Sequence, residues 1–175
     1  MGTVTKTIIV GAPIDRVFAF WRDFENFPRF MDHIESVQIV GPDESHWKMK
    51  GPFGSAMEWD AKTTSIEENH KIAWQSTGGQ IQTHGAVVFK PHGPDATEVT
   101  VGLAYRLAGG VLSEALAKLF ADPEDQLQAD LIRFKRMAEE YGLGSYDPGS
   151  SMPGDDSDSF DGIPENADAE SIAGE

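Results

Sequence analysis

The segment 12–31 constrains the fold of this chain more than any other, because it has the pattern of two short apolar helices in tandem. The first helix is predicted to begin at Pro13, since the missing N–H of a proline costs nothing in a first turn. Its apolar face then consists of Ile14, Val17, Phe18 and Trp21. A second apolar turn consists of Phe27, Phe30 and Met31. Pro28 excludes one continuous helix through both.

Between Met31 and Leu107 the period of the apolar residues changes to two, which is typical of half-buried β-strands. The clearest alternation flanks the turn sequence Gly51-Pro-Phe-Gly54, so this part is predicted to be a hairpin. The predicted strands cover residues 3–10, 34–40, 46–51, 57–63, 71–77, 81–91 and 97–107. This order of elements favours a curved antiparallel sheet that holds a helix.

The C-terminal region is predicted to form two helical parts. The apolar residues of the first part are Leu112, Leu116, Leu119 and Phe120. The second part begins at Asp122-Pro123, because aspartate is a favoured N-cap and a proline here cannot continue a helix from residue 119. Its apolar stripe consists of Leu127, Leu131, Phe134, Ala138 and Tyr141. This helix is therefore expected to cover an apolar surface with one face.

Composition divides the chain near residue 144. Beyond it Gly, Ser, Pro and Asp dominate, lysine and arginine are absent, and large apolar residues are isolated. Such a segment buries too little surface to offset the entropy of ordering it. We therefore predict one folded domain over residues 1–144 and a disordered acidic tail over residues 145–175.

The charge of the chain disfavours several partners. The formal net charge is −15, and removing the nine acids of the predicted tail leaves about −6 on the folded part. A surface of this sign repels phosphate, so nucleic acid and anionic lipid headgroups are disfavoured. The chain has no cysteine and no apolar run of about 18 to 20 residues. We expect a cytoplasmic protein without stable membrane insertion, and its oligomeric state stays open.

Sequence motifs for metal, phosphate or nucleophile chemistry are lacking. The five histidines are scattered without the spacing of metal ligands. Neither pair of adjacent glycines has the context of a phosphate loop, and no Gly-x-Ser-x-Gly motif occurs. No metal or cofactor is therefore predicted, and no catalytic residue is assigned.

Aromatic residues are the strongest candidates for a site. Five of them have the apolar parity of their strands, and one lies on the stripe of the C-terminal helix: Trp47, Trp59, Trp74, Phe89, Tyr105 and Phe134. Each one alone is compatible with an ordinary core. Their face also carries the hydroxyls of Thr63, Ser76, Thr83 and Tyr105. A few polar groups among aromatic side chains are typical of small-molecule pockets, so these six residues are the predicted ligand-binding set.

Several segments between residues 3 and 141 resemble a known family. They are Ala12-Pro-Ile-Asp-Arg-Val-Phe-Ala-Phe20, Phe24-Glu-Asn-Phe-Pro-Arg-Phe-Met31, Glu58-Trp-Asp-Ala61, Ile72-Ala-Trp-Gln-Ser76, Asp122-Pro-Glu-Asp-Gln126 and Asp130-Leu-Ile-Arg-Phe-Lys135. The chain resembles the polyketide cyclase/dehydrase group of the START-like helix-grip (SRPBCC) superfamily, which also includes coenzyme Q-binding START-like proteins. The resemblance implies an α+β helix-grip fold, with a curved antiparallel sheet in β-α-α-β6-α order around a long C-terminal helix.

The resemblance leaves more than one function open, because the family includes aromatase/cyclases as well as carriers of lipids and quinones. Our leading hypothesis is the binding of a hydrophobic or aromatic small molecule, of lipid, quinone or polyketide type, in an internal cavity. The first alternative is a cyclase or dehydratase that acts in the same cavity, with Tyr105 or a nearby hydroxyl as proton donor. The second is an interaction protein that works through the acidic tail.

Overall fold

The computed structural model describes residues 2–107 and 121–142. The first predicted helical part near Leu116 and the predicted tail 145–175 lie outside these residues. The chain begins with the elements β1 (Gly2–Val10), α1 (Ile14–Arg22), the 3₁₀ helix η1 (Phe24–Arg29), β2 (Ile34–Ile39), β3 (Glu44–Lys50) and the short η2 (Pro52–Gly54). It continues with β4 (Ala56–Glu67), β5 (Lys71–Gly79), β6 (Ile81–Pro91), β7 (Thr97–Leu107) and α3 (Pro123–Glu140).

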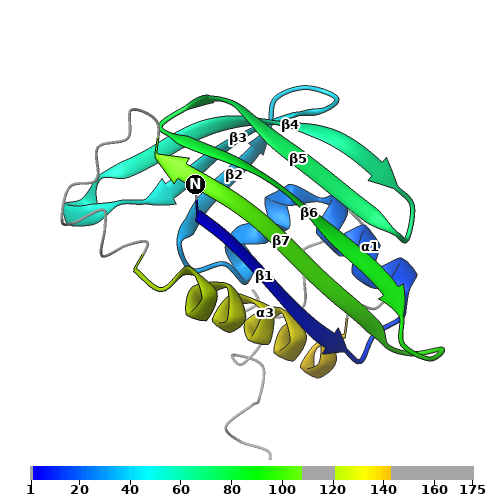
Figure 1. The fold of residues 1–175 in the computed structure, drawn as a ribbon. Coiled ribbons are helices and arrows are strands. Elements are labelled where there is room, and N and C mark those ends of the chain that lie inside the picture. The colour runs from blue at the N-terminus through cyan, green and yellow to red at the C-terminus, as the bar shows by residue number, and fades with distance from the viewer. Residues whose placement is uncertain (1, 108–120, 143–175) are drawn as a thin grey trace, which may run out of the picture.

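Seven antiparallel strands form one curled sheet in the order β1-β7-β6-β5-β4-β3-β2. The helices α1, η1 and α3 lie on the side toward which the sheet curls (Figure 1). The predicted α+β class and the helix-grip arrangement are confirmed. Two details differ: α1 begins at Ile14, with Pro13 as the residue before it, and the second predicted helix is a 3₁₀ helix that contains Pro28.

The helix α3 begins at Pro123, as the break at Asp122-Pro123 predicts. It runs along β1 (Figure 1). Lys135 Nζ donates to the Ile9 carbonyl at 2.7 Å, and the Glu139 carboxylate accepts from the Gly11 N–H at 2.8 Å. These contacts hold the C-terminal half of α3 against the end of β1. The N-terminal half of α3 therefore extends toward the start of β1 (Figure 1).

An aromatic core joins α1, η1 and α3 to the sheet. Phe134 is fully buried, and its ring centroid lies 5.5 Å from that of Phe20 and 5.3 Å from that of Trp21. Phe89 on β6 is also buried, with its ring centroid 5.4 Å from that of Phe18. Offset and edge-to-face rings at these distances stabilise a core beyond the burial of their area. The core thereby attaches these helices to the sheet.

One glycine allows β5 to approach β4 closely beside the site. Gly79 has φ +105°, and a Cβ atom at this position would lie 2.4 Å from the Cα of Trp59. Only glycine adopts this backbone conformation without strain at such a distance. The close approach therefore supports the backbone of Trp59, one of the predicted site residues.

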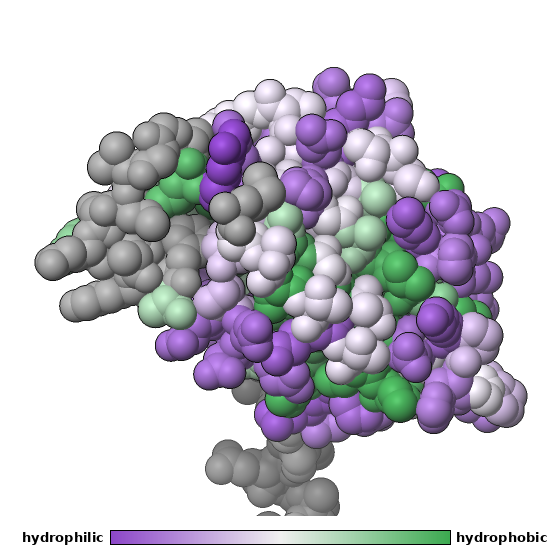
Figure 2. Space-filling view, in the orientation of Figure 1, coloured by the Kyte–Doolittle hydropathy of each residue, from purple (hydrophilic) through white to green (hydrophobic). Residues whose placement is uncertain are grey.

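The face of the molecule seen in Figure 2 is mixed in polarity. In the space-filling view, hydrophobic residues appear in small groups separated by hydrophilic ones over the sheet (Figure 2). No helix within residues 2–107 and 121–142 is long and apolar enough to cross a membrane.

Candidate functional site

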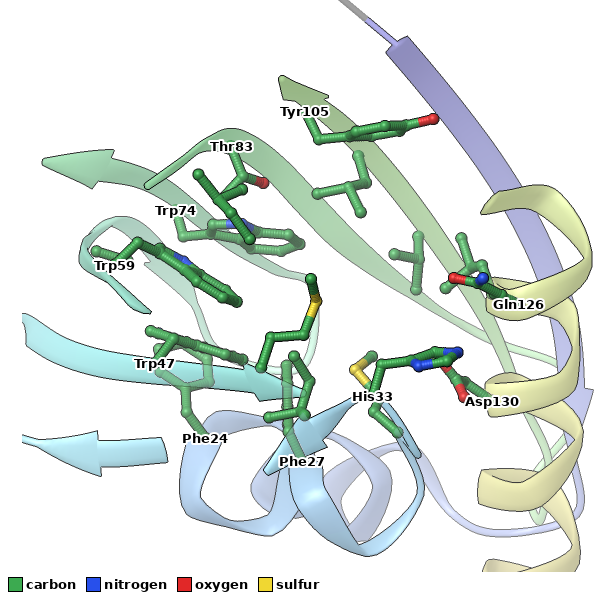
Figure 3. Close-up of a pocket in the computed structure, with 18 of the residues that line it drawn as sticks. Phe24, Phe27, His33, Trp47, Trp59, Trp74, Thr83, Tyr105, Gln126 and Asp130 are labelled. Carbon is green, nitrogen blue, oxygen red and sulfur yellow. The ribbon is translucent and has the colours of Figure 1, made fainter. Parts of the chain in front are cut away.

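A cavity of about 180 Å³ lies between the concave face of the sheet and the N-terminal half of α3. All four tryptophans of the chain line it. The aromatic part of the lining consists of Trp21, Phe24, Phe27, Trp47, Trp59, Trp74 and Tyr105. Aliphatic and methionine side chains, among them Met49, Ile81 and Leu103, make up most of the rest. The cavity is therefore an almost wholly apolar space (Figure 3).

The indole rings of Trp47 and Trp59 stack on each other in one wall of the cavity. These residues are direct partners in the β3–β4 register, and their side chains stack with ring centroids 5.8 Å apart and planes 16° apart. The Trp47 Nε1–H donates to the Ser45 hydroxyl at 2.8 Å, which fixes the orientation of the ring. The ring of Phe27 packs edge-to-face with that of Trp47, with the ring centroids 5.3 Å apart. The wall is therefore held in place from two sides, as a preformed binding surface requires.

A buried carboxylate lies on the helix side of this apolar space. Asp130 on α3 is 9% exposed, and burial raises its pKa from 3.8 to about 6, against the opposing effect of Arg133. The Asp130 Oδ1 accepts from Arg133 at 2.7 Å, and Arg133 also donates to the Phe30 carbonyl at 3.0 Å. The second guanidinium nitrogen lies 3.0 Å from the carboxylate of Asp32. A titratable group is thus held at the cavity wall by a fixed network.

Two further polar atoms in residues of the lining have no hydrogen-bond partner within the described part of the chain. They are the Oγ1 of Thr83, a residue 8% exposed, and the Nε1 of Trp21, a residue 1% exposed. Buried polar groups of native proteins are nearly always paired, and an unpaired one costs about 1–3 kcal/mol. Thr83 lies across the cavity from Asp130 (Figure 3). An unpaired hydroxyl here is a feature expected of a ligand-binding wall.

The structure brings four of the six predicted site residues together at this cavity: Trp47, Trp59, Trp74 and Tyr105. Phe89 and Phe134 are not in its lining and belong to the aromatic core described above, so their inclusion in the predicted set is corrected. The alternation of apolar and polar residues along a strand predicts which side chains lie on the concave face. It does not predict which of these side chains α1 covers. Of the other predicted hydroxyls, Thr83 lines the cavity and Ser76 accepts from the Thr83 backbone N–H at 3.0 Å.

Sequence reasoning missed the polar residues that α3 and the loop after η1 contribute. These are His33, Gln126 and Asp130. A signal for Asp130 exists in the sequence, because it lies three residues after Leu127 and four before Phe134. A carboxylate at that spacing interrupts the apolar stripe of the helix. His33 and Gln126 have no comparable signal, since each lies in a mixed polar segment.

The described lining of the cavity contains an acidic residue but no lysine or arginine. Within residues 2–107 and 121–142, no lysine or arginine lines it, and Asp130 is its one acidic residue. In the same part of the chain, no three His, Asp or Glu side chains gather in the manner of metal ligands. The arrangement is suited to enclosing an apolar molecule and to exchanging a proton at one carboxyl group.

A curled antiparallel sheet that grips a C-terminal helix, with an apolar cavity between them, defines a helix-grip fold. The chain belongs to the family described as "Polyketide cyclase / dehydrase and lipid transport", whose model matches residues 10–132.

Solved structures agree with this assignment. A structural genomics target from Deinococcus radiodurans is 33% identical with a TM-score of 0.66, covering 80% of this chain and 98% of its own. A START superfamily protein from Mycobacterium smegmatis is 20% identical with a TM-score of 0.63, covering 77% of this chain and 97% of its own. The Zhui aromatase/cyclase from Streptomyces sp. R1128 is 19% identical with a TM-score of 0.64, covering 79% of this chain and 94% of its own. The last two share the fold.

Proposed function

We propose that this protein binds a small hydrophobic or aromatic molecule, of lipid, quinone or polyketide type, in the cavity between the sheet and α3. The observation that carries the proposal is the convergence of all four tryptophans on one apolar space. A core without a ligand is normally packed to crystal density, so an open space lined by rigid aromatic walls favours a binding site. Binding would be driven by the transfer of apolar area from water, at about 25 cal/mol per Å² before the costs of association.

The volume limits which part of a ligand is enclosed. An apolar cavity of about 150 Å³ holds one benzene ring. The space of about 180 Å³ therefore fits one ring or a small bicyclic skeleton. A longer ligand would place such a group between the Trp47–Trp59 wall and α3, with its remainder outside the cavity.

A calorimetric titration of the full chain with 2-indanol, a neutral bicyclic alcohol, tests the proposal. We expect saturable binding with one site. The variant Ala61→Leu adds three carbon atoms at a buried lining position and should weaken binding at least tenfold. Thr64→Leu is the matched control, because residue 64 is exposed on the same strand and is expected to leave binding unchanged. Absence of saturable binding to the native protein would contradict the proposal.

The second candidate function is that of a cyclase or dehydratase in the same cavity, and Asp130 is the observation that favours it. A carboxyl group with a pKa of about 6 can both donate and accept a proton near neutral pH. Tyr105 places a phenol in the same lining. The test substrate is a linear β-polyketone, whose aldol closure and loss of water form a phenol. An enzyme would accelerate this closure, and Tyr105→Phe would lower turnover while leaving 2-indanol binding intact.

A further inference from the structure

Among residues 2–107 and 121–142, no lysine or arginine lines the cavity to hold an anionic ligand. Its described lining contains one carboxylate, Asp130, and no lysine or arginine. The protein as a whole has a formal net charge of −15. An anion that enters this space is therefore repelled over a long range by the protein and at short range by Asp130.

The charge of Asp130 is not fully balanced by its neighbours. Arg133 lies 2.7 Å from the carboxylate of Asp130 and 3.0 Å from that of Asp32, so two acids share one guanidinium. The other titratable residues in the described lining are His33 and Tyr105. When both acids are ionised, the two carboxylates and the one guanidinium together carry one uncompensated negative charge. Asp130 is the buried acid of the two and lines the cavity, whereas Asp32 is exposed to solvent.

The opposite wall complements the same kind of ligand. The face of an indole ring is electronegative and attracts cations, and tryptophan is the strongest of the aromatic residues in this respect. Trp47, Trp59 and Trp74 all contribute to the lining on the sheet side (Figure 3). A protonated amine on an apolar skeleton would lie between these indole rings and the carboxylate of Asp130.

We propose that the cavity selects apolar ligands that bear a protonated amine over those that bear a carboxylate, with Asp130 as the counter-ion. This inference rests on the proposed binding function and adds the charge class of the ligand. Its basis is geometric: a buried carboxylate that shares its guanidinium, the absence of lining lysine and arginine in the described residues, and the indole rings across the cavity. The raised pKa of Asp130 supports it, because a carboxylate that is costly to ionise gains from a cationic partner.

Three ligands with one skeleton test the proposal: 2-aminoindane, 2-indanol and indane-2-carboxylate. At about pH 8 the amine is a cation, the alcohol is neutral and the acid is an anion. Calorimetric titration of the full native chain should give the order amine, alcohol, carboxylate. A charge-assisted contact in a partly buried site predicts that the amine binds roughly tenfold more tightly than the alcohol, and the alcohol more tightly than the carboxylate.

The variant Asp130→Asn keeps the shape of the side chain and removes its charge. It should bring the affinity for the amine to within about threefold of that for the alcohol. The matched control is Asp125→Asn, which removes the same charge from an exposed position on the same helix. This control should keep the order of the native protein.

A second measurement uses the native protein alone. Lowering the pH from about 8 to about 5 protonates Asp130, so the affinity for the amine should fall while that for the alcohol stays constant.

The outcomes separate the two levels of the proposal. If none of the three ligands binds, the proposed function itself is wrong. If the alcohol binds and the carboxylate binds as tightly as the amine, the cavity binds apolar molecules but the charge preference is wrong. If the amine is preferred equally in Asp130→Asn and its affinity does not depend on pH, Asp130 is not the counter-ion and the inference is overturned.

Discussion

Replacing Asp130 by asparagine should make the protein more stable at alkaline pH, although it removes an ion pair. The carboxylate accepts from Arg133 at 2.7 Å, and such a pair is commonly regarded as stabilising. Burial outweighs the pair here, because the pKa of Asp130 lies above its usual value in spite of the guanidinium. Asparagine resembles the protonated acid in shape, and Arg133 keeps its contacts to Asp32 and the Phe30 carbonyl.

The magnitude follows from the linkage between protonation and folding. The folded protein binds the proton more tightly than the unfolded chain, so stability falls as the pH rises from 3.8 to about 6. Above this pH range the ionised Asp130 lowers the free energy of unfolding by its full amount. The difference between the two pKa values corresponds to about 3 kcal/mol, at 1.36 kcal/mol for each pKa unit. Below pH 3.8 this penalty is absent. We expect Asp130→Asn to be more stable than the native protein by about 1–3 kcal/mol at pH 8 and to lose that advantage near pH 4.

Urea denaturation at the two pH values, followed by tryptophan fluorescence, measures this difference. The control Asp125→Asn should shift the midpoint little at either pH, because residue 125 is exposed. The reasoning is refuted if Asp130→Asn is less stable than the native protein at pH 8, since the pair with Arg133 would then outweigh the cost of burial.

Three further predictions concern other side chains of the core, the cavity and the outer face. Phe134→Ala should cost about 3–5 kcal/mol in urea denaturation, because the ring is fully buried against other rings; Trp59→Ala should cost less, since part of its surface borders open space, and an equal cost would show that Trp59 is ordinary core. Thr83→Val should raise the free energy of unfolding by about 1 kcal/mol, because it removes a buried hydroxyl without a partner in the described chain; a decrease would show that the hydroxyl is paired. His46 should titrate above 6.5 in NMR, because its hydrogen bond to Asp60 at 2.8 Å raises its pKa; Asp60→Asn should lower that pKa, and an unchanged value would exclude this cause.

The strands and helices could be predicted because each has a clear local period. Trp47, Trp59 and Trp74 each have the apolar parity within their own strand, and the structure brings all three to one cavity. Pro123 likewise fixed the start of α3 through the steric rule for proline. These features depend on near neighbours in the chain.

The division between core and cavity could not be predicted from the same patterns. Phe89 and Tyr105 both have the apolar parity of their strands. Phe89 is covered by Phe18 of α1, whereas Tyr105 lies near the end of β7 and lines the cavity. Which strand residues α1 covers depends on the packing of its rings against β6 and α3. The contribution of His33 likewise depends on the path of the loop after η1, which no local pattern in the sequence specifies.

The central claim is that the space beside the four tryptophans is a binding site, and the indole N–H resonances of ¹⁵N-labelled protein test it most directly. All four indoles line the cavity. Titration with 2-indanol should shift resonances of Trp47, Trp59 and Trp74 along one saturable curve, and Ala61→Leu should suppress these shifts. Indole resonances that stay unchanged at high ligand concentration, or that shift linearly without saturation, would contradict the account.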